Sequence, residues 1–239
     1  MPTPILEISD VTLCYNAVEH CRDINASVRE GSFVLFLGAN GKGKSTLLIT
    51  IAGLQPAMKG EISVDNKNII DYPIKDLAKK IAFLPSSHEM VDGLLVIELL
   101  SFSRIPFKTW FQNTNVKDMN IITKVAQQTG ILELLDQTYN TLSDGQKQKV
   151  NIARCLVQET RIILLDEPTA HLDIVNKIQI FELIRSLTKD GKTIICTTHD
   201  VRDASAYATH FWMIDNNGKF KTSEFDSTVT PDDLIAKLF

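Results

Sequence analysis

Apolar residues in the first third of the chain follow two patterns. In residues 5–11 they alternate with polar residues, whereas residues 33–37 (FVLFL) are apolar throughout. Alternation predicts a strand with one buried face, and an unbroken run predicts a strand buried on both faces. Residues 60–66 and 80–84 have the composition of two further strands, and residues 44–51 that of a helix. This part of the chain is therefore expected to combine several strands with a short helix.

Helical spacing dominates the middle of the chain. From about residue 96 to residue 156, apolar residues recur every three or four positions, which is the period of an amphipathic helix. Strand and helix patterns then alternate again: strands at 161–167, 193–198 and 211–215, helices at 173–189, after Asp200 and near Thr230. Such alternation predicts a largely parallel sheet, so the helical middle is expected to be an insertion into an α/β core.

Composition narrows the class of protein. A chain of 239 residues, 44% of them hydrophobic, is long enough for one large domain or for a domain with a subdomain. Its net charge of −4 argues against a nucleic-acid-binding protein, and its longest apolar runs are far too short to span a membrane. The four cysteines form no C-x-x-C pair, which argues against a zinc site or a disulfide framework. We expect a soluble protein of a reducing compartment, with no signal peptide.

A glycine-rich stretch follows the buried strand at 33–37. The sequence GANGKGKST, residues 38–46, matches G-x-x-x-x-G-K-[ST] and leads into the predicted helix. Glycines allow several backbone N–H groups to point at one anion, and the helix N-terminus adds partial positive charge. In this pattern Lys44 neutralises the β- and γ-phosphates of a nucleotide, and the Ser45 hydroxyl binds Mg²⁺. The motif in this context predicts a nucleotide-phosphate site.

Two acids stand at the end of a second buried strand. Asp166 and Glu167 follow the apolar run at 162–165, at the carboxyl end where open α/β sheets bind ligands. An isolated acidic pair most often just ends a strand at the surface. Beside a phosphate site, however, Asp166 fits a metal-side carboxylate and Glu167 fits a general base. A second turn, Ser143 and Gly145 in TLSDGQ, also has the composition of an anion site at the head of a helix.

These motifs resemble, in order and over nearly the whole chain, those of the ATP-binding cassette (ABC) ATPases. Residues 38–46 resemble the family's Walker A loop, residues 162–167 (IILLDE) its Walker B strand, and residues 142–146 (LSDGQ) its signature motif. Residues 170–173 (AHLD) resemble the D-loop, and 197–200 (TTHD) place His199 at the switch histidine. The resemblance implies a P-loop NTPase (RecA-like) α/β core with an N-terminal antiparallel β region and an inserted α-helical subdomain.

The resemblance also assigns roles to residues. It implies Glu167, His199 and Lys44 as catalytic residues, and Ser45, Asp166 and Ser86 as residues around Mg²⁺. Tyr15 stands where the family has an aromatic residue stacked on adenine. The expected ATP-binding residues are Tyr15, Gly38, Ala39, Asn40, Gly41, Lys42, Gly43, Lys44, Ser45, Thr46, Ser143, Gly145 and Gln146. In the family, two copies pack head to tail and each signature turn binds the ATP held by the other copy, which accounts for two anion-binding turns in one chain.

Two positions depart from the family pattern. The family has a glutamine after the strand that precedes the insertion, and the matching position here is Ser86. Serine is shorter, so it either acts through an additional water or weakens coupling and turnover; we favour the first alternative, since the catalytic residues are all present. Asp144 replaces the first glycine of the signature motif. Because an acid is favourable at a helix N-terminus, we expect its side chain to face away from the phosphate.

The chain is therefore expected to be one ABC ATPase domain, with core residues 1–85 and 159–239 and the insertion at 86–158. As it carries no spanning segment, we expect a peripheral subunit on the cytoplasmic face of the membrane, with a second copy, permease subunits and a substrate-binding protein as partners. Residues 103–106 (SRIP) partly resemble importers of iron chelates, haem and cobalamin; alternatively, the aromatic residues that follow pack the insertion. A non-import ABC ATPase and a poorly hydrolysing regulatory module remain alternatives.

Overall fold

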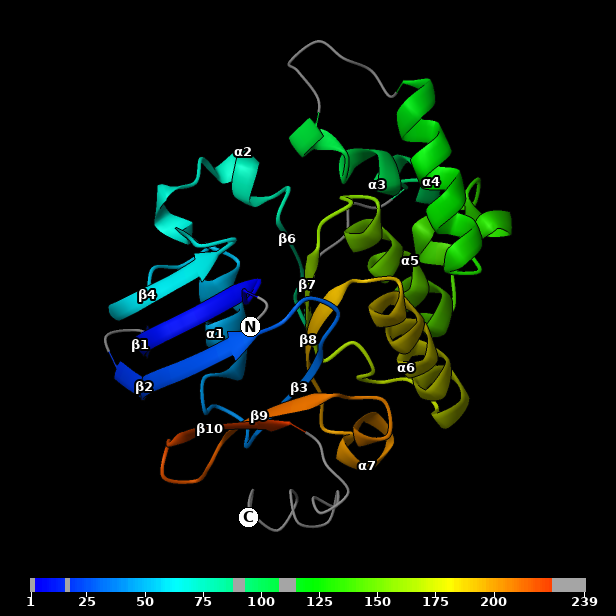
Figure 1. The fold of residues 1–239 in the computed structure, drawn as a ribbon. Helices are drawn as coiled ribbons and strands as arrows, with labels where there is room; N and C mark the ends of the chain where they lie inside the picture. Colours follow the sequence, from blue (N-terminus) through cyan, green and yellow to red (C-terminus); the bar gives the residue numbers. More distant parts are fainter. Residues whose placement is uncertain (1–2, 16–17, 88–92, 108–114, 225–239) are drawn as a thin grey trace.

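A computed structural model describes residues 3–15, 18–87, 93–107 and 115–224 and contains two β-sheets (Figure 1). The first is an antiparallel sheet in the order β2-β1-β4-β5. Its strands are β1 (Leu6–Tyr15), β2 (Val18–Val28), β4 (Lys59–Val64) and β5 (Lys67–Asn68). The second sheet has the order β10-β9-β3-β8-β7-β6. Its strands are β3 (Phe33–Gly38), β6 (Ile81–Leu84), β7 (Ile162–Asp166), β8 (Thr193–Thr197), β9 (His210–Ile214) and β10 (Phe220–Glu224).

The second sheet is parallel except at one edge. Strands β6, β7, β8, β3 and β9 pair in parallel, and β10 pairs antiparallel to β9. The α-helices are α1 (Lys44–Ile51), α2 (Ile74–Leu77), α3 (Val96–Phe102), α4 (Val116–Gln128), α5 (Asp144–Leu156), α6 (Ile174–Lys189) and α7 (Val201–Ser205). The mixed α/β fold with an N-terminal antiparallel sheet is confirmed. Helices α3, α4 and α5 follow β6 and precede β7 in the chain; the boundaries of the domain division stay a prediction.

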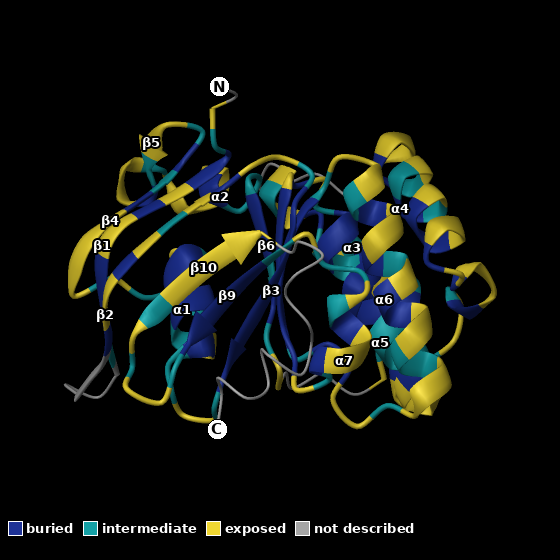
Figure 2. Cartoon of the chain, turned by 60° about the horizontal axis from the view of Figure 1, so that its bottom comes forward, coloured by how far each residue is buried: buried dark blue, intermediate teal, exposed yellow. Residues whose placement is uncertain are grey.

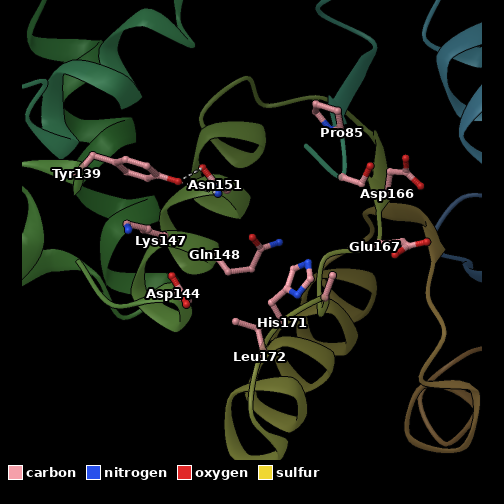
Figure 3. A pocket seen from close by; sticks show the side chains of 12 residues that line it. Pro85, Tyr139, Asp144, Lys147, Gln148, Asn151, Asp166, Glu167, His171 and Leu172 are labelled. Atoms are coloured by element: carbon pink, nitrogen blue, oxygen red, sulfur yellow. Dashed lines mark hydrogen bonds between the residues drawn. The ribbon is translucent and has the colours of Figure 1, made fainter. Parts of the chain in front are cut away.

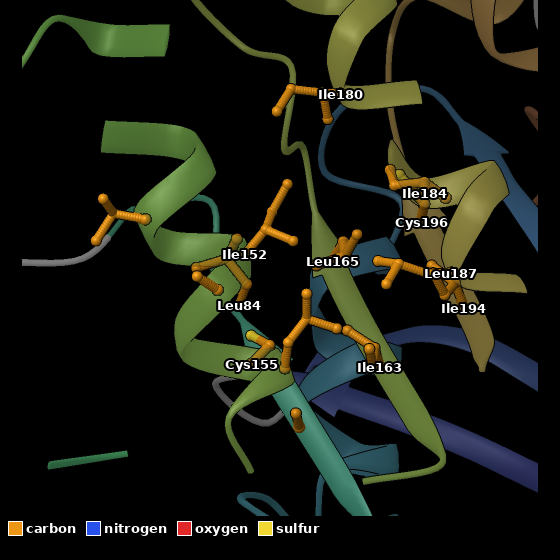
Figure 4. Close-up of a cluster of buried hydrophobic side chains, with 14 of the residues drawn as sticks. Leu84, Ile152, Cys155, Ile163, Leu165, Ile180, Ile184, Leu187, Ile194 and Cys196 are labelled. Carbon is orange, nitrogen blue, oxygen red and sulfur yellow. The ribbon is translucent and has the colours of Figure 1, made fainter. Parts of the chain in front are cut away.

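Both faces of the parallel sheet are buried, as the unbroken apolar run of β3 predicts (Figure 2). Val34 and Phe36 pack toward α1 and the antiparallel sheet. Phe33, Leu35 and Leu37 pack on the other side, in a cluster that includes side chains of α5 and α6 (Figure 4). The sheet is thus a rigid middle layer, and its strand ends are suited to hold a site.

Three strands were not predicted: β2, β10 and β5, which has only two residues and so gives no pattern. In β2 the buried residues Cys21 and Ile24 are three positions apart, because Asp23 between them has a φ of 55° and the pairing with β1 shifts register there. This irregularity removes the period of two that identifies a strand. Strand β10 is exposed along most of its length and therefore has no apolar signal. The helix predicted near Thr230 lies outside the described residues.

The strand order brings three distant segments together. Strand β8 lies between β3 and β7, with Phe36 paired to Thr197 and Thr197 paired to Asp166. Because these strands are parallel, the glycine-rich loop, the acidic pair and the His199 loop all lie at the carboxyl ends of the strands, on the same side of the sheet. Within the described residues, no helix is both long enough and apolar enough to cross a membrane.

Candidate functional site

The loop between β3 and α1 leaves backbone N–H groups available at a helix N-terminus. Gly43 precedes α1 with a φ of 96°, and no side chain caps the helix. The first intrahelical bond runs from the N–H of Leu47 to the oxygen of Gly43 at 2.9 Å. Among the described residues, nothing accepts a hydrogen bond from the N–H groups of Lys44, Ser45 or Thr46. These donors, together with the helix dipole, form a site suited to phosphate.

Lys44 is held inside this loop. Its side chain is buried, and its Nζ donates to the carbonyl oxygens of Gly38 at 2.7 Å and Ala39 at 3.2 Å. Burial lowers the pKa of Lys44 below its usual value, while the carboxylates of Glu167 and Asp166 oppose that effect. An incoming phosphate would likewise favour the charged amine. Lys44 is therefore placed to bind an anion.

Asp166 and Glu167 are fixed from the neighbouring strand by Thr197. The Thr197 hydroxyl donates to Asp166 Oδ1 at 2.6 Å and accepts from the backbone N–H of Glu167 at 2.9 Å. Asp166 is only 3% exposed. Sequence reasoning missed Thr197, although it begins the TTHD stretch that pointed to His199. A hydroxyl next to the switch histidine was the signal that could have found it.

Glu167 and His199 meet at the mouth of the site. Glu167 Oε1 lies 2.9 Å from His199 Nε2, and their side chains are 28% and 50% exposed. Glu167 has a φ of 52°, an uncommon backbone conformation for a residue with a side chain. Such outliers persist where the surroundings impose them, often at functional sites. In this pair, the Glu167 carboxylate can accept a proton from a water, and the His199 imidazole fixes the orientation of that carboxylate.

A cavity of about 190 Å³ is lined on one side by Glu167 (Figure 3). Its walls include Asp166, Glu167 and Ser86, which brings the predicted metal-side residues Asp166 and Ser86 to one space. The other walls are Pro85, Tyr139, Asp144, Lys147, Gln148, Asn151, Ala170, His171 and Leu172. Asp144 thus faces the cavity that its own chain forms. Its orientation toward a nucleotide on another copy stays a prediction.

The signature turn has an internal structural function. Ser143 caps α5: its hydroxyl accepts from the N–H of Gln146 at 3.4 Å, and Gln146 Oε1 accepts from the N–H of Ser143 at 2.9 Å. A Cβ atom at Gly145 would lie 2.4 Å from Asn176 Oδ1 in the first turn of α6. Glycine therefore leaves room for the Asn176 side chain, whose Nδ2 donates to Asp173 Oδ2 at 2.8 Å, apart from any contact with a nucleotide.

The remaining predicted residues occupy different surroundings. Asn40, Gly41 and Ser45 are exposed on the glycine-rich loop, and Lys42 Nζ donates to the oxygen of Asn216 at 2.9 Å. Tyr15 ends β1, and its side chain lies outside what the structure describes. Sequence reasoning also missed Thr169, Lys177, Thr198 and Asp200, which are hydrogen-bonded behind the Glu167–His199 pair.

The donors present fit a nucleotide carrying Mg²⁺. Within the described residues, no group of three or more His, Cys, Asp or Glu side chains is arranged to hold a metal by itself. Mg²⁺ does not require one, because it is commonly held by one or two protein groups together with substrate phosphates and waters. The Ser45 hydroxyl, the Asp166 carboxylate and the Ser86 hydroxyl are the groups that would hold it.

Comparison with known proteins places this site in a family. The family model for ABC transporters matches residues 21–170. The chain is 35% identical over 213 residues to the iron(3+)-hydroxamate import ATP-binding protein FhuC of Bacillus subtilis, covering 89% of this chain and 79% of that protein. It is 34% identical over 230 residues to the ferric enterobactin transport ATP-binding protein FepC of Escherichia coli, covering 96% and 84%.

A solved structure agrees with these relatives. The dimeric ATP-binding cassette MJ0796, bound to ADP and phosphate, superposes with a TM-score of 0.78 at 27% identity, covering 93% of this chain and 99% of that one. The residues matched by the family model, 21–170, include the glycine-rich loop, the acidic pair and the signature turn. The chain therefore belongs to the ABC transporter family, as one of its ATP-hydrolysing, ATP-binding subunits.

Proposed function

We propose that this subunit powers the import of an iron chelate through membrane-embedded permease subunits. The observation that carries the mechanism is the 2.9 Å contact between Glu167 and His199 beside the phosphate-binding loop. Support for the substrate class comes from the names of FhuC and FepC, which concern ferric hydroxamate and ferric enterobactin. These two relatives are almost equally similar to the chain yet serve different chelates. The proposal is therefore limited to iron chelates as a class.

ATP binding uses the groups of the glycine-rich loop. The N–H groups of Lys44, Ser45 and Thr46 donate to phosphate oxygens, and Lys44 Nζ turns from the carbonyls of Gly38 and Ala39 to the β- and γ-phosphates. Ser45 and Asp166, with Ser86 nearby, would hold Mg²⁺, which would supply positive charge to the phosphates. Tyr15 stacks on the adenine.

Hydrolysis depends mainly on positioning, as is general for phosphoryl transfer. Glu167 accepts a hydrogen bond from the attacking water and directs its oxygen at the γ-phosphate. His199, half exposed beside Glu167, fixes the carboxylate and contacts the same phosphate. Thr197 holds the backbone of Glu167 and one oxygen of Asp166, so both acids keep their places during the reaction.

The active form is a head-to-tail dimer. Ser143, Gly145 and Gln146 of each copy complete the ATP site of the other, a proposal supported by the dimeric structure of MJ0796. Closure on two ATP molecules and opening after hydrolysis drive the permease subunits, and a substrate-binding protein delivers the chelate. The coupling surface lies around residues 85–111, of which 88–92 and 108–111 are outside the described residues. The subunit is peripheral, at the cytoplasmic face of the membrane.

The Glu167→Gln variant tests the mechanism, since it keeps the shape of the side chain but removes the carboxylate charge. Turnover should fall by more than about 100-fold while ATP binding is kept, because the phosphate-binding groups are untouched. Undiminished turnover in Glu167→Gln would contradict the proposed role.

The alternative function is a regulatory module that hydrolyses ATP poorly, which Ser86 in place of glutamine favours. It predicts no turnover in the unaltered chain even with its permease. Stimulation of ATPase activity by ferric hydroxamate or ferric enterobactin in proteoliposomes tests the substrate class.

A further inference from the structure

The Glu167–His199 pair is supported by an ion pair that lies behind it. Lys177, one turn into α6, places its Nζ 2.6 Å from Asp200 Oδ1, and both side chains are largely buried, at 23% and 22% exposure. Asp200 immediately follows His199 in the sequence. The ion pair thus joins α6 to the loop that carries the switch histidine.

The same carboxylate also reaches the loop that carries Glu167. Asp200 Oδ2 accepts a hydrogen bond at 2.9 Å from the hydroxyl of Thr169, two residues after Glu167. The Thr169 hydroxyl lies 3.1 Å from that of Thr198, which accepts from the N–H of Asp200 at 3.0 Å. Thr169 and Thr198 are 1% and 4% exposed. One carboxylate therefore connects both catalytic loops within a buried hydrogen-bond network.

The catalytic side chains themselves have few other supports. Glu167 is fixed through its backbone N–H, which donates to the Thr197 hydroxyl and to the Thr197 carbonyl oxygen at 3.1 Å. Within the described residues, the only side chain bonded to the ring of His199 is Glu167. The distance between these two groups is consequently set by how the 167–169 and 198–200 backbones are held together. Asp200 holds both, and Lys177 holds Asp200.

We propose that Lys177 and Asp200 are positioning residues for ATP hydrolysis. This inference rests on the proposed catalytic roles of Glu167 and His199. Lys177 neutralises Asp200 and fixes its rotamer, which keeps the two loops in register and the carboxylate–imidazole pair aligned with the attacking water. A small displacement of groups that position reactants lowers the rate of reaction much more than it lowers stability. Loss of a lysine that merely joined two elements would instead lower stability more than it lowered the rate.

The test compares kinetic constants of full-length variants. Lys177→Met should lower kcat by about 10- to 100-fold and leave the KM for ATP within about twofold, because Lys177 touches none of the phosphate-binding groups. Lys177→Arg keeps the charge and should restore most of kcat. Lys149→Met is the matched control: Lys149 joins α5 to α6 by donating to Gln179 Oε1 at 2.8 Å, a contact that includes no residue of either catalytic loop, and its loss should leave kcat unchanged.

Asp200→Asn breaks the same ion pair from its other side. If the two residues act together, the double variant Lys177→Met/Asp200→Asn should be no slower than Asp200→Asn alone. Thermal unfolding of each variant identifies any that fail to fold. If Lys177→Met is one of them, the kcat of Lys177→Arg is compared with that of Asp200→Asn instead. A kcat for Lys177→Met within twofold of the unaltered chain overturns the inference, as does an equal loss in Lys149→Met. Glu167→Gln, measured in parallel, separates the hypotheses: its full activity overturns the proposed function itself.

Discussion

At the scale of single residues, the Thr197 hydroxyl fixes two acids of the site, since it donates to Asp166 Oδ1 and accepts from the backbone N–H of Glu167. Its contact with Asp166 joins residues 31 positions apart and exists because β7 and β8 pair in one register. Register depends on the packing of whole strands, which local patterns do not encode.

Asp65 gives a test of electrostatics away from the site. Burial raises its pKa, but bonds from Lys80, at 2.8 Å, and Arg161 outweigh that effect and hold the pKa below its usual value. A carboxyl whose pKa is lower in the folded than in the unfolded state adds stability above its unfolded pKa, and the added stability disappears as the pH falls through the folded pKa.

Asp65→Asn should therefore lower the free energy of unfolding at pH 7 by about 1 kcal/mol, and by progressively less below pH 4. Asparagine keeps the shape and tolerates the φ of 52° at this position. Urea unfolding measured from pH 7 to pH 3.5 gives the comparison. Asp76→Asn, in the exposed pair with Lys79, serves as a control with a smaller effect. A pH-independent loss in Asp65→Asn would show that the stability does not come from the ionised carboxylate.

At the scale of elements, regular patterns were predicted well and irregular ones were not. Strand β3 and helix α6 were found within one or two residues because their apolar spacing is uniform. Strand β2 was missed because its bulge puts the buried residues Cys21 and Ile24 three positions apart, which interrupts the period of two. The register shifts of the antiparallel sheet thus cannot be predicted from a period of two.

The SRIP stretch, residues 103–106, has a clear structural role. Arg104 is buried, with its Nε 2.9 Å from Asp118 Oδ1 at the start of α4. Its Nη1 donates both to the Val157 carbonyl oxygen at 2.6 Å and to Glu159 Oε2 at 2.9 Å, just after α5, and its guanidinium lies over the Phe107 ring. One side chain therefore ties α3, α4 and α5 together. Trp110 and Phe111, which pack the insertion in the alternative interpretation of this stretch, lie outside the described residues.

Gly60 tests the β1–β4 pairing. It has a φ of 82°, and a Cβ atom there would lie 2.4 Å from the carbonyl oxygen of Asp10, at the register shift between Ser9 and Thr12. The obstacle is backbone, so Gly60→Ala should lower the free energy of unfolding by about 2–4 kcal/mol. Denaturant unfolding measures the loss.

Gly191 separates the clash from backbone strain. It has a similar φ of 87°, but an added Cβ would meet nothing within 4 Å. Gly191→Ala therefore carries only the cost of a left-handed conformation, about 1–2 kcal/mol. Equal losses in the two variants would show that strain alone accounts for the effect at Gly60 and that the close approach of β1 is relieved.

At the scale of the whole molecule, the arrangement of the anion-binding turns bears on how copies work together. The glycine-rich loop leads into α1 and the signature turn begins α5, on separate parts of the fold (Figure 1). In the proposed dimer, each ATP lies between the loop of one copy and the turn of the other. A defect in one turn then disables the partner's site rather than its own.

Mixing two inactive variants tests this division. Ser143→Arg should abolish turnover by placing a large side chain where a phosphate binds, whereas Asp144→Gly should stay within a few-fold of the unaltered chain, since the Ser143 cap and Gly145 are kept. In a dimer of one Ser143→Arg copy and one Glu167→Gln copy, one site carries both defects. The other site combines an intact Glu167 with an intact signature turn.

An equimolar mixture should therefore regain up to about a quarter of unaltered turnover, because about half of the dimers pair unlike copies and each such dimer has one intact site. Turnover is measured after the two variants have been mixed and allowed to exchange partners, against each variant alone at the same total concentration. Sites contained within single chains would give no recovery, since every chain would then carry its own defect. Recovery would place Ser143 in the partner's site, which makes dimerisation a step of catalysis.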